Sequence, residues 1–127
     1  DLLEVMCAVA LGDVNACTLE WDDGWAVSVV LASGGYPGDY EKGKLISGIE
    51  AAEALEGVRV YHAGTKREDD GSLVTSGGRV LNVTALGASF EEAQQRAYQA
   101  VDCIDFEGKQ FRRDIGARAL RGRSAWA

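Results

Sequence analysis

The 127-residue sequence predicts an α+β fold, in which a mainly antiparallel sheet is joined by one long helix and shorter flanking helices. Three observations predict it. Strand-like stretches follow one another along residues 58–87 with turn signals between them, one long amphipathic stretch follows at 89–104, and 46% of the residues are apolar. Adjacent strands followed by a helix favour α+β over a parallel, doubly wound sheet, and the length and apolar content suit a single domain.

Residues 1–24 are expected to be the end of a preceding region that leads into the domain. The first eleven residues have the apolar spacing of a helix, which Gly12 would end. The following "VNACTLEWDD" is predicted to be an edge strand that ends in an acidic turn. Because the sequence begins without Met and inside an amphipathic pattern, we expect it to be a piece of a longer protein.

The middle of the chain predicts strands and one short helix. "WAVSVVLA" at 25–32 has the composition of a buried strand. In "SGIEAAEALEG", Ser47 as N-cap, Glu50 three residues later and Gly57 past the end predict the helix.

Two further strand runs follow and are joined by a turn. "GVRVYHAGTKRED" alternates as a strand, and "EDDG" at 68–71 predicts a hairpin turn into "SLVTSGGRVLNVTALG". Gly77 and Gly78 interrupt this last run, which indicates either a bulge or a turn between two short strands.

The long helix has the clearest signal. Ser89 and Glu92 have the spacing of a capping box. Apolar residues then recur at helical spacing on one face, which predicts core packing: Phe90, Ala93, Ala97, Val101 and Ile104.

Charge and composition exclude several classes of function. The net charge is −7, although residues 109–127 alone carry +5. The remaining acidic body disfavours DNA or RNA binding. The basic tail could hold one small anion or be a solvated face. The apolar runs are too short to span a bilayer. Three Cys without a C-x-x-C pair predict a reducing, cytoplasmic location. The single His, with no Cys pair near it, disfavours a zinc site.

The stretch "SGGYPGDYEKGK" at 33–44 is the first candidate site. Pro37 and Gly38 predict a type II turn over Tyr36 to Asp39, with positive φ at Gly38. Gly34 and Gly35 would let a ligand or another segment approach the backbone. An ordinary surface loop with solvated charges is the alternative.

No catalytic motif accompanies this loop. The sequence has no G-x-S-x-G, no Walker loop, no dinucleotide-binding fingerprint and no metal-loop pattern of carboxylates. From the residues alone, the glycine loop and the Arg112-Arg113 pair are the two polar places of interest.

Several stretches, in order, resemble one enzyme family. "LASGGYPGDYEKGK", "VYHAGT", "SGGRVLNVTALG" and "AQQRAYQAVDCIDFEGKQFRRDIGARAL" closely resemble the C-terminal domain of the phosphoribosylamine-glycine ligases, which are ATP-grasp enzymes. The resemblance covers about 31–120, so the domain is placed at 25–120, and the tail at 121–127 has no family feature.

The resemblance implies a part of a ligase. The family joins glycine to 5-phosphoribosylamine in purine (IMP) biosynthesis, using ATP and Mg²⁺ to form a glycyl phosphate. Both ATP and Mg²⁺ are expected to bind outside this chain, in the ATP-grasp domains, and no catalytic, cofactor-binding or metal residue is assigned within it. The domain is expected to pack on the N-terminal and ATP-grasp domains and to form one wall of the substrate cleft. The isolated fragment is therefore expected to be inactive, and a non-catalytic binding or scaffold module with the same fold is the alternative.

The resemblance also implies substrate-binding residues. It places the loop near the domain junction and the cleft, with Gly34, Gly35, Tyr36, Pro37 and Gly38 as candidates. "FRRDIG" looks like the segment whose arginine pair contacts the ribose 5-phosphate in related purine ligases, which adds Arg112 and Arg113. In a strand their side chains would point to opposite faces, so one would reach the phosphate while the other pairs with Asp114 or another carboxylate. Structural salt bridges for both are the alternative.

Overall fold

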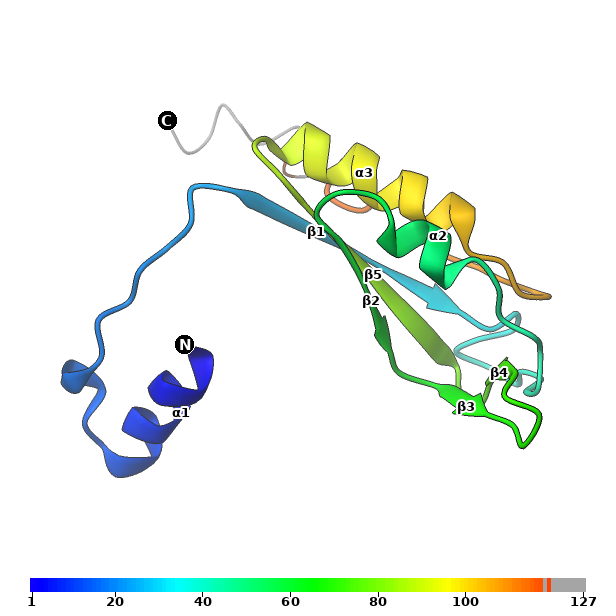
Figure 1. The fold of residues 1–127 in the computed structure, drawn as a ribbon, viewed down its shortest axis with the longest axis horizontal. Coiled ribbons are helices and arrows are strands. Elements are labelled where there is room, and N and C mark those ends of the chain that lie inside the picture. The colour runs from blue at the N-terminus through cyan, green and yellow to red at the C-terminus, as the bar shows by residue number, and fades with distance from the viewer. Residues whose placement is uncertain (118, 120–127) are drawn as a thin grey trace.

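A three-stranded antiparallel sheet is the centre of the computed structural model, which describes residues 1–117 and 119. Strand β5 (Arg79–Gly87) lies between β1 (Trp25–Ala32) and β2 (Val58–His62) and pairs antiparallel with both. Helix α3 (Phe90–Cys103) and the short α2 (Ile49–Glu53) cover one face of this sheet (Figure 1). The predicted α+β fold with an antiparallel sheet and one long helix is confirmed.

The core lies between the sheet and α3. Alternate residues of the strands, such as Val29, Leu81 and Val60, face the helix and are buried. All five residues of the predicted apolar stripe of α3 belong to this core: Phe90, Ala93, Ala97, Val101 and Ile104.

The predicted N-terminus of α3 is also confirmed. The Ser89 side chain accepts a hydrogen bond of 3.1 Å from the backbone N–H of Glu92. In return the Glu92 carboxylate accepts one of 2.7 Å from the N–H of Ala88, the residue before the cap. Two N–H groups at this helix start are thereby satisfied.

The opposite face of the sheet is open in the described chain. Ser28 and Val30 of β1 and Leu86 of β5 project from it and are exposed. The hydroxyls of Ser28 and Thr84 lie 2.6 Å apart across the two strands. We call this surface the open face.

The N-terminal residues form a helix but no strand. Helix α1 (Leu2–Leu11) ends at Gly12, as predicted, with φ of 74°. It lies away from the sheet (Figure 1), and its apolar side chains are exposed, with Leu2 at 73% and Leu11 at 83%. The predicted edge strand after it is wrong: residues Val14–Ala16 form a 3-10 turn, η1, and the rest is irregular because no partner strand lies beside it.

The start of α2 differs from the prediction by one residue. Gly48, with φ of 84°, precedes the helix, and no side chain caps it. Ser47 instead exchanges two backbone hydrogen bonds of 3.0 Å with Asp105. The Ser47 backbone is therefore used to join α2 to the segment after α3.

A small second sheet lies beside the first. The run predicted as one strand breaks at Ala63-Gly64 into β2 and β3 (Thr65–Arg67), and β3 pairs with β4 (Leu73–Thr75). The hairpin turn predicted at 68–71 is confirmed. Gly77 and Gly78 form the predicted connection between β4 and β5.

Two findings complete the description of the fold. Within residues 1–117 and 119, no helix has the length and apolar character that crossing a membrane would require. The predicted tail at 121–127 lies outside the described residues.

Candidate functional site

The glycine loop is fastened at both of its ends. The backbone N–H of Ser33 donates to the carbonyl of Gly78 at 2.8 Å, and its hydroxyl donates to the carbonyl of Gly77 at 2.9 Å. At the other end, Gly43 and Lys44 bond to the backbone and side chain of Thr75 at 2.7 and 3.1 Å. One anchor is on β4 and the other is on the connection between β4 and β5. The position of the loop is therefore set by these two strands and their connection.

The turn inside the loop differs from the predicted one. The Tyr36–Pro37 peptide bond is cis, and the N–H of Gly38 bonds to the carbonyl of Gly35 at 2.8 Å. A cis proline at the third position defines a type VI turn over Gly35 to Gly38. The type II turn with positive φ at Gly38 is wrong, since Gly35, with φ of 96°, is the residue of this turn that needs glycine.

Glycines let three segments approach each other closely here. A Cβ on Gly78 would lie 2.2 Å from the ring of Tyr36, so this ring lies directly on the connection between β4 and β5. A Cβ on Gly34 would lie 3.0 Å from the carbonyl oxygen of Gly108, which follows α3. The loop is thus packed between two segments that are distant in sequence.

Gln110 joins the loop to the segment that carries the arginine pair. Its backbone exchanges hydrogen bonds of 2.8 and 3.0 Å with Ala32 at the end of β1. Its side-chain amide donates to the carbonyls of Ser33 and Tyr36 at 2.8 and 3.0 Å. The two candidate sites of the sequence are therefore adjacent in the structure.

These segments surround a hollow of about 480 Å³ at one end of the open face, which we call the loop hollow. Three candidate residues, Tyr36, Pro37 and Arg112, line it. Gly34, Gly35, Gly38 and Arg113 are not among its lining residues. The remaining lining residues are Val30, Ala32, Arg79, Gln110 and Phe111.

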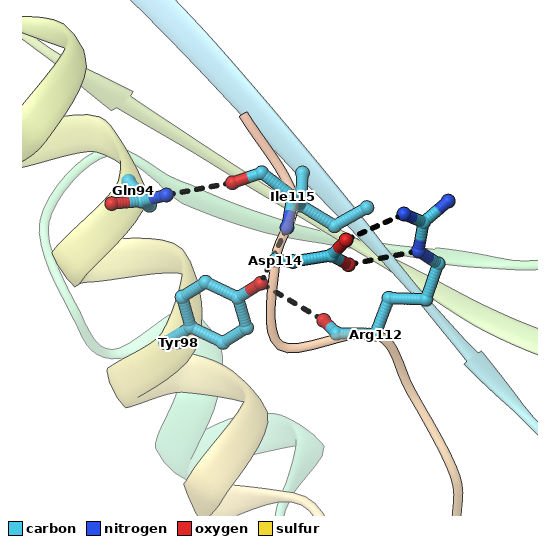
Figure 2. Close-up of polar contacts among 5 residues, drawn as sticks. All are labelled: Gln94, Tyr98, Arg112, Asp114 and Ile115. Carbon is cyan, nitrogen blue, oxygen red and sulfur yellow. Dashed lines mark hydrogen bonds and ion pairs between the residues drawn. The ribbon is translucent and has the colours of Figure 1, made fainter. Parts of the chain in front are cut away.

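Arg112 is held in place by an acidic neighbour. Its guanidinium donates to both oxygens of Asp114, at 2.9 and 2.7 Å, and the two side chains are 74% and 60% exposed (Figure 2). The hydrogen bond to Asp114 raises the pKa of Arg112, so its positive charge is secure. Arg112 is thus the arginine that pairs with Asp114, a choice that the sequence left open.

Helix α3 positions the backbone around Arg112. The Tyr98 hydroxyl donates to the Arg112 carbonyl at 2.8 Å and accepts from the Ile115 N–H at 3.2 Å, while the Gln94 amide donates to the Ile115 carbonyl at 2.6 Å (Figure 2). The segment is irregular and is not a strand, so the alternation of side chains considered for a strand does not apply to Arg112 and Arg113. Arg113 lies over the Phe111 ring, 4.8 Å from its centroid.

Sequence reasoning missed Arg79, which also lines the loop hollow. The signal available was an arginine directly after Gly77-Gly78 at the start of a strand. Regular alternation along a strand would place Arg79 on the same face as Leu81, away from the loop hollow, so the pattern gave no reason to select it.

The described residues form no metal-binding cluster. In the part of the chain that the structure describes, no three His, Cys, Asp or Glu side chains are grouped so that they could hold a metal ion. His62, at the end of β2, has its Nδ1 3.1 Å from the Thr65 hydroxyl.

Known proteins resemble the chain over most of its length. Residues 26–118 match the family described as "Phosphoribosylglycinamide synthetase, C domain". A chloroplastic phosphoribosylamine-glycine ligase of Arabidopsis thaliana is 50% identical over 122 residues, which cover 95% of this chain and 23% of the relative. One from Chlorobaculum tepidum is 51% identical over 120 residues, 94% of this chain and 28% of the relative.

A solved structure shares the fold. The crystal structure of phosphoribosylamine-glycine ligase from Thermotoga maritima matches with a TM-score of 0.68 and 40% identity, covering 88% of this chain and 27% of that one. The chain therefore spans roughly a quarter of the length of the curated relatives that it matches.

Proposed function

The chain belongs to the family of phosphoribosylglycinamide synthetase C domains, as its resemblance predicted, and from this we propose that it acts as the C-terminal domain of a phosphoribosylamine-glycine ligase. The whole enzyme would join glycine to 5-phosphoribosylamine with ATP in purine biosynthesis. Half of the residues are identical to those of a named ligase over 95% of the chain, which supports this proposal. The alternative, a non-catalytic binding or scaffold module with the same fold, is not favoured.

We propose that the loop hollow is part of the wall of the substrate cleft and that Arg112 binds the 5-phosphate of phosphoribosylamine. The observation that carries this is the joining of the glycine loop and Arg112 around one hollow by Gln110. A guanidinium has five N–H donors in a planar fork that matches phosphate. Asp114 uses two of the Arg112 donors, which fixes the fork and leaves the others for a ligand.

ATP and Mg²⁺ are proposed to bind in the N-terminal and ATP-grasp domains of the same polypeptide, outside this chain. The relatives are about four times as long as the chain, which leaves room for such domains. The exposed apolar side chains of α1, among them Leu2, Met6 and Leu11, support contact with those domains, because large apolar surfaces are usually covered in the working protein.

The proposed location is the cytoplasm. Three free cysteines support a reducing compartment. One relative, the ligase of Arabidopsis thaliana, is named as chloroplastic.

Single substitutions in the full-length ligase test the proposed function. Arg112→Ala and Arg113→Ala are assayed separately for KM toward phosphoribosylamine, glycine and ATP. We expect Arg112→Ala to raise the KM for phosphoribosylamine selectively, because that substrate carries the sugar phosphate at issue. If both variants keep the parental KM for it, or weaken all three substrates equally, the phosphate-binding role is wrong.

A further inference from the structure

A β-bulge turns Arg79 toward the loop hollow. Leu31 pairs with Leu81, but the next residue of β1, Ala32, pairs with Arg79, so Val80 is an extra residue in β5. Regular alternation would place Arg79 on the helix-covered face with Leu81. The bulge instead places it opposite Ala32, on the open face, where it lines the hollow with that residue.

The guanidinium of Arg79 has no partner in the described chain. Arg79 is exposed, and no hydrogen bond or ion pair of its side chain is found among residues 1–117 and 119. By contrast, Arg96 is paired with Glu92 and Arg112 with Asp114. The free guanidinium of Arg79 is therefore available to an external anion. Arg59 is equally free beside another hollow, so Arg79 is distinguished by lining the same hollow as Arg112.

The surroundings of Arg79 suit a phosphorylated sugar. A second hollow of about 510 Å³ adjoins the loop hollow and shares Val30, Tyr36 and Arg79 with it. Asn82 lines this second hollow, and its side-chain oxygen is buried without a hydrogen-bond partner. That oxygen is covered by the protein, but the side-chain amide of Asn82 also has N–H donors, which suit the hydroxyl of a sugar in this hollow.

We propose that Arg79 is a second phosphate-binding residue, which acts with Arg112 on the 5-phosphate of the phosphoribosyl substrate. This rests on the proposed function of the loop hollow. A phosphate carries more negative charge than one guanidinium neutralises, and two guanidinium groups lining one hollow provide donors from two directions. Arg112 comes from the C-terminal segment and Arg79 from the sheet, so the site would require both to be in place.

The test compares Arg79→Ala, Arg79→Lys, Arg112→Ala and Arg59→Ala in the full-length ligase. Arg59 is the matched control: it is also an exposed arginine of the sheet without a partner in the described chain, but it lines another hollow, between α2 and β2. For each variant, KM is measured for the three substrates, and inhibition constants are measured for ribose 5-phosphate and ribose.

We expect Arg79→Ala to raise the KM for phosphoribosylamine and the inhibition constant of ribose 5-phosphate about tenfold or more, corresponding to roughly 1.4 kcal/mol of lost binding. The KM values for glycine and ATP and the inhibition by ribose should stay within about twofold. Arg79→Lys should recover part of the loss because it keeps the charge. Arg59→Ala should behave as the parent.

Each other outcome is decisive. Parental values for Arg79→Ala beside a selective loss in Arg112→Ala overturn the role of Arg79 and leave the proposed function standing. A loss in Arg79→Ala that is equal for all three substrates also overturns it, because that indicates a structural role. A selective loss in Arg79→Ala alone overturns the joint action with Arg112, and with it the role proposed for Arg112, and leaves Arg79 as the phosphate-binding residue. Parental values for both variants overturn both proposals.

Discussion

Gly35→Ala should destabilise the domain through two separate effects. Gly35 has φ of 96°, a conformation that side chains with a Cβ rarely adopt. A Cβ at this position would also lie 2.1 Å from the backbone oxygen of Asp39. Because the obstructing atom belongs to the backbone of the same tight loop, a side-chain rotation cannot relieve the overlap.

The magnitude follows from the sum of the two effects. Holding a non-glycine residue in such a conformation costs about 1–3 kcal/mol. Overpacking that must shift neighbouring atoms costs typically about 1–3 kcal/mol. We therefore expect the free energy of unfolding to fall by about 2–6 kcal/mol, a large share of the roughly 5–15 kcal/mol that holds a domain folded.

Gly43→Ala is the control that separates the two effects. Gly43 has φ of 79°, but nothing lies within 4 Å of an added Cβ, so only the backbone conformation is strained. Urea unfolding of the 127-residue chain, followed by far-ultraviolet circular dichroism, measures both variants. If Gly35→Ala and Gly43→Ala lower the free energy of unfolding equally, the overlap between the added Cβ and the Asp39 oxygen does not destabilise the domain, and the reasoning is wrong.

Three further predictions concern the same chain. The isolated chain should fold but should neither bind ATP tightly nor form glycinamide ribonucleotide; turnover by the purified chain, with host ligase excluded, would contradict this. Lys109→Met should lower the free energy of unfolding by about 1–2 kcal/mol, because the Lys109 ammonium donates to the Val101 and Ile104 carbonyls at the end of α3, whereas Lys42→Met on an exposed residue should change it little. Hydrogen bonding to Lys44 lowers the pKa of Glu41 below its ordinary value. The stabilisation from this pair is therefore present above the ordinary pKa of a glutamate and is lost as the pH falls through the lower folded-state pKa. Glu41→Gln should therefore be less stable than the parent at pH 7 and equal to it in strong acid, and a difference independent of pH would count against the pair.

Local patterns in the sequence were sufficient for the regular elements. The stripe from Phe90 to Ile104 predicted both α3 and its buried face, because apolar residues at helical spacing lie together on one face of a helix. The hairpin at 68–71 was predicted for a similar reason, since its turn residues and flanking strands are adjacent in sequence. The family resemblance also lay in the sequence, in the order of its glycine and arginine stretches.

The tertiary structure alone decided how the site is assembled. The turn at Pro37 was predicted with the wrong geometry, because the cis or trans state of the peptide bond before proline depends on surrounding contacts. The pairing of Gln110 with Ala32 joins residues that are far apart along the chain, and no local sequence pattern predicts it.

Arg79 shows most clearly what the sequence determined and what it did not. The sequence determined that an arginine follows two glycines at the start of a strand. Its direction depends on one extra residue, Val80, which arises where β5 pairs with β1. Side chains alternate with a period of two along a strand, so a single inserted residue moves Arg79 from the covered face to the open face. That shift belongs to the register between two strands separated by nearly fifty residues, and only folding establishes it.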